Sequence, residues 1–87
     1  MSKELERHLK ALANRRRIAM LRYLKRRRQA SVTEIAGAIK LSFKATSKHL
    51  RLLATTDILE HEQKSLQRFY SFAATLPFIV RALLSRL

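Results

Sequence analysis

Residues 31–53, with the sequence SVTEIAGAIKLSFKATSKHLRLL, constrain the fold more than any other part of the chain. Ser31 followed by Glu34 three residues later is the capping-box pattern that begins a helix. This helix should end near Lys40, and Ser42 is placed to cap another helix directly after it. Two short helices joined by about three residues form a helix-turn-helix.

The second of these helices has one face for a core and another face that must point elsewhere. Thr46, Leu50 and Leu53 follow the spacing i, i+4 and i+7, which places them on one side of a helix. The basic residues of the stretch fall outside that side. The stretch is therefore either a core helix with a solvated polar face or a helix whose polar face lies in a DNA groove.

Two further helices are predicted before this pair. The first covers about residues 3–13 and the second about residues 15–27, and Asn14 between them can cap the second. The first has leucines at helical spacing. The second has an apolar stripe of Ile18, Met20, Leu21 and Leu24, and a cationic outer face that includes Arg15, Arg22 and Arg26.

A hairpin and a last helix are predicted after the pair. Residues 58–62 and 67–72 are strand-like runs, and residues 63–66 between them form a polar, basic tip. Thr75 is placed to cap a helix over about residues 76–87, in which Pro77 is tolerated in the first turn. The apolar stripe of this helix consists of Leu76, Ile79, Val80, Leu83, Leu84 and Leu87.

This order of elements predicts a winged helix-turn-helix, a mainly α fold with a small β-hairpin, over a single domain of residues 1–87. A chain of this length buries only about 60% of the surface that it exposes when unfolded, so a roomy active-site cavity is not expected. The sequence has no nucleophile motif or phosphate-binding loop. We therefore predict neither an enzyme nor a bound cofactor.

The charge of the chain indicates a polyanionic partner. Lys and Arg total 19 against six Asp and Glu, which gives a formal charge of +13, while the hydrophobic fraction of 47% is that of a folded domain. Such an imbalance raises the local potential by several kT. Nucleic acid is the leading candidate partner, followed by an anionic membrane or a heparin-like polymer.

Other sites and locations are limited by what the sequence lacks. The chain has no cysteine, which excludes disulfides and thiolate metal sites. Glu4 with His8, and the run of residues 60–62, offer two or three metal ligands without a fourth, so we predict solvated side chains there and no metal site. No apolar run approaches the roughly 20 residues of a membrane span, and the N-terminus lacks the pattern of a signal peptide. A cytoplasmic protein is expected, nucleoid-associated in a prokaryote.

Three stretches resemble the arsenical-resistance-repressor (ArsR) family of dimeric transcription regulators: LKALANRRRIAMLRYL, VTEIAGAIKLSFKATSKHLRLL and the hairpin EHEQKSLQRFYSF. The resemblance covers roughly residues 9–72. Its most specific part is the family's recognition helix, matched at Leu41, Ser42, Ser47, His49, Leu50 and Leu53. The resemblance implies DNA binding by the helix within residues 41–53 and by the hairpin, and a repressor as the function.

The departures from the family concern sensing and turns. The family's metal-binding cysteines would fall at Ser31 and Thr33, and the last helix lacks the Asp and His of other members, which argues against those metal sites. Lys40 replaces a turn glycine, at a cost of order 1 kcal/mol in a left-handed conformation, so this turn can be built differently here. The wing tip, often Gly-Arg in the family, is Ser65-Leu66, which passes the groove-reaching role to Lys64 or Arg68.

These considerations predict a set of DNA contacts. The residues expected to approach bases are Lys44, Ala45, Lys48 and Ser47. The residues expected to hold the phosphate backbone are Ser42, His49, Arg51 and, by the resemblance, Arg17. His49 can equally be a neutral imidazole that satisfies a buried partner. In the wing, the residues expected against the minor groove or flanking phosphates are Lys64, Gln67 and Arg68.

The wide leucine stripe of the last helix can be core, a membrane-surface anchor or half of a dimer interface. Pairing with the first helix across a two-fold axis explains its width best, and would place two recognition helices about one DNA turn apart. The dimer residues predicted on these two helices are Leu5, Leu9, Ile79, Leu83 and Leu87.

The function predicted from the sequence is a homodimeric regulator, a repressor, that binds specific sequences of double-stranded DNA. Two other functions stay open at this point. One is a sequence-indifferent nucleic-acid binder, either architectural or for RNA, and the other is a protein-interaction module on a winged-helix scaffold.

Overall fold

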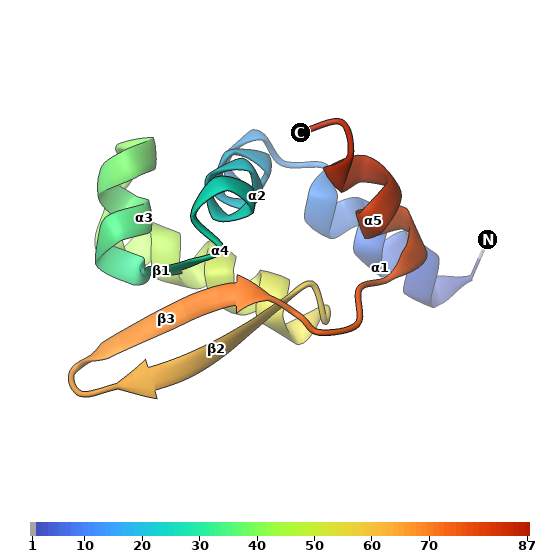
Figure 1. The fold of residues 1–87 in the computed structure, drawn as a ribbon. Helices are drawn as coiled ribbons and strands as arrows, with labels where there is room; N and C mark the ends of the chain where they lie inside the picture. Colours follow the sequence, from blue (N-terminus) through green and yellow to red (C-terminus); the bar gives the residue numbers. More distant parts are fainter. Residues whose placement is uncertain (1) are drawn as a thin grey trace.

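The computed structural model describes residues 2–87 as five helices and a three-stranded antiparallel sheet (Figure 1). In chain order the elements are α1 (Lys3–Leu12), α2 (Arg15–Arg27), β1 (Gln29–Ser31), α3 (Val32–Ile39), α4 (Phe43–Thr55), β2 (Leu59–Lys64), β3 (Gln67–Phe72) and α5 (Phe78–Leu84). The strands lie in the order β1-β3-β2. The predicted winged helix-turn-helix is confirmed, with β2 and β3 as the wing.

The helix starts are set by the caps that the sequence indicated. The Ser31 hydroxyl accepts the Glu34 N–H at 3.1 Å, and a Glu34 carboxylate oxygen accepts the Ser31 N–H at 2.8 Å, so the capping box of α3 is complete. The hydrogen bond from the Ser31 N–H also holds the pKa of the Glu34 carboxyl below its usual value. The Ser42 hydroxyl accepts the Ala45 N–H at 3.1 Å and begins α4.

The turn between α3 and α4 does not need the family's glycine. Lys40 has φ 57° and ψ 51°, the left-handed conformation, and the Leu41 N–H donates to the Ala36 carbonyl at 3.0 Å. The alternative of a differently built turn is therefore wrong. The strain of a side chain in this conformation is retained here instead of being avoided.

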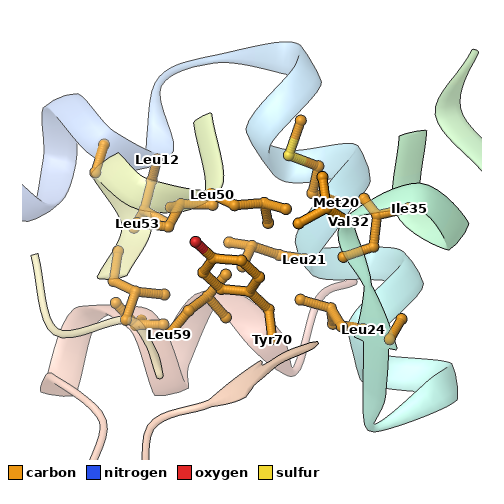
Figure 2. Close-up of a cluster of buried hydrophobic side chains, with 14 residues drawn as sticks. Leu12, Met20, Leu21, Leu24, Val32, Ile35, Leu50, Leu53, Leu59 and Tyr70 are labelled. Carbon is orange, nitrogen blue, oxygen red and sulfur yellow. The ribbon is translucent and has the colours of Figure 1, made fainter. Parts of the chain in front are cut away.

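The core lies between the helices and the sheet, with Tyr70 of β3 at its centre (Figure 2). Thr46, Leu50 and Leu53 of α4 are fully buried, which confirms their predicted core face. Around them pack Met20, Leu21, Leu24, Val32, Ile35, Ile58, Leu59 and Val80. The burial of α4 on this side fixes which of its residues are left on the surface.

Two parts of the chain differ from the expectation. Strand β1 was not predicted; its three residues pair with Ser71, Tyr70 and Phe69 of β3. The last helix covers Phe78–Leu84 rather than about residues 76–87, and Thr75 does not cap it. Pro77 stands at the N-cap position in an extended conformation, φ −56° and ψ 146°, with no side-chain cap. With Pro77 as the N-cap, the first residue of α5 is Phe78.

The wing tip is also tighter than predicted. The strands extend to Lys64 and from Gln67, so the turn consists of Ser65 and Leu66 alone, with Ser65 at φ 57°. None of the helices within residues 2–87 is both long and apolar enough to cross a membrane.

Candidate nucleic-acid interface

The outer face of α4 is cationic and has no intramolecular partners. Lys44, Lys48 and Arg51 repeat the spacing i, i+4 and i+7 on the side opposite the buried residues, and all three are exposed. Within residues 2–87, none of these side chains makes a hydrogen bond or an ion pair; the one ion pair there joins Lys10 and Glu6 at 4.0 Å. The three cations are therefore free to bind an external anion.

The smaller predicted residues of α4 lie beside this face. Ala45 and Ser47 are half-buried on its two flanks, so they can meet a ligand only at close approach. Ser42 is exposed, and its hydroxyl already accepts the Ala45 N–H. The hydroxyl of such a cap can still donate its own proton to a phosphate oxygen.

On the flank of α4 that faces α2, His49 is held by Arg17. The Arg17 guanidinium donates through Nη1 to His49 Nδ1 at 3.2 Å, so Nδ1 is unprotonated and the imidazole proton is on Nε2. Burial, followed by the nearby charge of Arg17, lowers the pKa of His49 below its usual value. The ring is therefore a neutral acceptor for Arg17, and its Nε2–H has no partner within the described chain.

Arg17 also closes the end of α1. Its Nε donates to the Ala11 carbonyl at 2.6 Å and its Nη2 to the Lys10 carbonyl at 3.1 Å. These are two of the last four carbonyls of α1, which have no partner within the helix. Burial lowers the pKa of this guanidinium. Arg17 thus joins α1, α2 and α4, and two of its five N–H groups remain for the phosphate contact predicted for it.

The pleat of the wing separates the basic residues that were predicted to act together. Arg68 pairs with Gln63 and points to the same side of the sheet as Tyr70, which is the side of the helices, and its Nε donates to Gln63 Oε1 at 3.4 Å. Lys64 pairs with Gln67 on the opposite side. Its ammonium donates to Gln29 Oε1 at 3.1 Å and lies 5.2 Å from the Phe69 ring centre. Of the two cations, Arg68 is the one on the side of α4.

A hollow of about 250 Å³ separates the wing from α3 and α4, and its lining includes residues that sequence reasoning missed. Polar groups come from Thr33, Ser47, Gln63, Gln67 and Arg68, and apolar groups from Phe43 and Leu66. Phe43 is 60% exposed and Leu66 is 96% exposed. The spacing of Phe43 from Thr46 suggests a core position, but Phe43 begins the helix, beyond the end of the core.

A second surface, formed by α1 and α5, carries the predicted dimer residues. The two helices lie side by side at the end of the molecule away from the wing tip (Figure 1). Leu5 and Leu9 are 38% and 39% exposed, while Ile79, Leu83 and Leu87 are half-buried. A mainly apolar groove of about 490 Å³ runs between α1, the start of α2 and α5. Its lining includes Leu9, Ile18, Ile79, Leu83 and Arg86.

The histidines considered as metal ligands have other neighbours. His8 is buried, and its Nε2 donates to the Thr56 carbonyl at 3.1 Å, while the His61 ring lies 5.5 Å from the Tyr70 ring. Across residues 2–87 no group of three or more His, Cys, Asp or Glu side chains is placed to hold a metal ion. Ser31, at one of the family's cysteine positions, is buried as the cap of α3.

The fold and this surface define a winged helix-turn-helix protein with an exposed cationic recognition helix. No protein-family model and no curated protein sequence matches the chain. Solved structures do match. HlyU from Vibrio cholerae N16961 shares 28% identity over 99% of this chain and 92% of its own, with a TM-score of 0.82. NolR from Sinorhizobium fredii shares 25% identity over 97% and 80%, with a TM-score of 0.80.

A third match carries the family's name in its description. It is the homodimeric winged helix-turn-helix DNA-binding domain of a possible ArsR-family transcriptional regulator from Mycobacterium bovis. It shares 26% identity over 95% of this chain and 73% of its own, with a TM-score of 0.80. The resemblance to the ArsR family inferred from sequence motifs is thus confirmed at the level of structure.

Proposed function

We propose that this protein is a homodimeric transcription regulator, acting as a repressor in the cytoplasm, that binds specific sites on double-stranded DNA. The structural neighbours support the class, since one is described as a homodimeric DNA-binding domain and another as a transcriptional repressor. Helix α4 lies in the major groove, where Lys44 and Lys48 donate to guanine O6 and N7. The wing, formed by β2 and β3, lies over the adjoining DNA strand.

The observation that carries the proposal is the unpartnered cationic face of α4. Lys44, Lys48 and Arg51 stand in one row on a helix whose other side is fully buried, so the helix presents them rigidly. An α-helix fits the major groove of B-DNA, which is about 12 Å wide. The net charge of +13 adds long-range attraction to the phosphates.

The proposed dimer uses the α1 and α5 surface. Leu5 and Leu9 would be covered by the partner, and the two copies of α4 would meet successive major grooves about 34 Å apart. We expect Leu9→Lys to dissociate the dimer in sedimentation experiments and to weaken binding to a two-half-site duplex. Unchanged sedimentation of this variant would place the interface elsewhere.

A selection from random duplexes tests the DNA function. The wild-type protein should enrich a motif with two related half-sites, and Lys48→Ala should lower the ratio of specific to nonspecific affinity. Arg22→Ala, which removes the same charge from an exposed position on α2, is the control and should leave this ratio unchanged.

The other two functions predict different results in the same experiment. A sequence-indifferent binder would show a steep salt dependence, with a slope of about 0.9 per phosphate contacted, and no enriched motif. A protein-interaction module would bind neither DNA nor RNA at moderate salt. An enriched half-site motif excludes both.

A further inference from the structure

Two large apolar side chains remain exposed at the DNA-facing end of the molecule. The large hydrophobic residues exposed in the described chain are Leu5, Leu9, Phe43, Leu52, Leu66 and Phe78. Leu5, Leu9 and Phe78 belong to α1 and α5, the surface of the proposed dimer. Phe43 and Leu66 lie instead at the start of α4 and at the tip of the wing, where that dimer cannot cover them (Figure 1).

These two side chains line one hollow from opposite sides. Phe43 is contributed by the first turn of α4 and Leu66 by the turn between β2 and β3. Between them the lining supplies the hydroxyls of Thr33 and Ser47 and the guanidinium of Arg68. An apolar pair around polar donors and a cation fits one strand of a duplex, which offers anionic phosphates next to apolar sugar and base surfaces.

We propose that Phe43 and Leu66 contact the operator directly, an inference that rests on the proposed DNA-binding function. Phe43 packs against the methyl group of a thymine in the major groove. Leu66 packs against the deoxyribose wall of the minor groove on the other side of the same strand. Ser47 and Arg68 hold the intervening phosphate.

The chemistry of both contacts follows from the position of each residue. The N-terminal residues of a recognition helix are the ones that reach base edges, and a phenyl ring can meet a thymine methyl there. Leucine is among the apolar side chains that proteins place in the minor groove. Since Leu66 carries no charge, it displaces no counterion from DNA, and its share of the affinity should not depend on salt.

Leu66 is tested by affinity at several salt concentrations, with the site enriched by the wild-type protein. Leu66→Ala should bind roughly tenfold more weakly at every concentration, with an unchanged salt slope. Leu66→Met should bind like the wild type, while Arg68→Ala should lower the slope by about 1.8, because each of the two subunits loses one phosphate contact worth about 0.9. Because Leu66 is 96% exposed, its truncation does not disturb the fold. Equal affinity of Leu66→Ala and the wild type would overturn this contact.

Phe43 is tested by removing the methyl group from the DNA. Replacing thymine by uracil at one position per half-site should weaken wild-type binding roughly fourfold for each half-site changed, and should have no effect on Phe43→Ala. If Phe43→Ala responds to uracil as the wild type does, the contact is wrong. Failure of the wild-type protein to enrich any site would refute the proposed function itself, so the two failures can be told apart.

Discussion

Replacement of Arg17 by alanine should destabilise the fold more than the loss of any other single cation would. Arg17 satisfies the carbonyls of Lys10 and Ala11, and it donates to His49 on the recognition helix. The other two terminal carbonyls of α1 have backbone partners, since Leu9 accepts from the Ala13 N–H and Leu12 from the Asn14 N–H. Without Arg17, two carbonyls at the end of α1 lose their partner.

The magnitude follows from these three hydrogen bonds. A net contribution of about 0.5–1.5 kcal/mol each gives a loss of about 2–4 kcal/mol in the free energy of unfolding. The positive charge of the guanidinium also interacts favourably with the negative, C-terminal end of the α1 dipole. For a domain of this size, such a loss lowers the melting temperature by roughly 10–25 °C. It is a large share of a typical total stability of about 5–15 kcal/mol.

Urea unfolding followed by circular dichroism measures this change, with Arg16→Ala as the matched control. Arg16 is exposed, and its side chain makes no hydrogen bond within the described residues, so its loss should change stability by less than about 0.5 kcal/mol. Arg17→Lys should be intermediate, because one ammonium group cannot reproduce the fork of a guanidinium. If Arg17→Ala is as stable as Arg16→Ala, the proposed stabilisation of the C-terminal carbonyls of α1 by Arg17 is refuted.

The same variants address the phosphate contact predicted for Arg17. If its two remaining N–H groups bind a phosphate, Arg17→Ala should also lower the salt slope of DNA binding by up to about 1.8, which is about 0.9 for each subunit of the dimer. A destabilised variant with an unchanged slope would make Arg17 a structural residue only.

Three further outcomes are expected. The pKa of His49 is lower in the folded state, so its contribution to stability is complete above its unfolded pKa of about 6.5 and is lost as pH falls through the folded value. Between pH 7.5 and pH 5, urea unfolding should therefore show a smaller loss of stability for His49→Gln than for the wild type. An equal loss of stability in the two proteins would contradict the lowered pKa. Lys40→Gly should raise the melting temperature by several degrees, since it relieves a left-handed turn by roughly 1 kcal/mol, and a lower melting temperature would show that the turn is not strained. Tyr70→Phe should be neutral or stabilising by up to about 1 kcal/mol in calorimetry, because the buried Tyr70 hydroxyl has no partner within residues 2–87; a marked loss would reveal a partner for this hydroxyl.

The helices were predictable because their signals are local. Caps at Asn14, Ser31 and Ser42 satisfy backbone N–H groups only a few residues away, and those bonds are the ones that the structure contains. The spacing of Thr46, Leu50 and Leu53 likewise fixed the buried side of α4 from a stretch of eight residues. The hairpin was found from its two runs, although its turn is shorter than predicted.

The elements that were missed depend on distant partners. The three residues of β1 are a strand only because β3, about 40 residues later in the chain, offers its edge. Lys64, Gln67 and Arg68 were predicted to act together on DNA because they are close in sequence. The pleat sends Lys64 to Gln29 on one side and Arg68 toward the helices on the other.

The sequence by itself determined the order of the elements, the core side of α4 and its cationic outer face, since helix periodicity and end capping act over one or two turns. Only the tertiary structure decided that Arg17 joins α1 to His49, that Phe43 lies outside the core, and that Phe43 and Leu66 share a hollow. Each of these depends on groups brought together from separate segments, whose relative positions are set by packing around Tyr70 and not by local spacing.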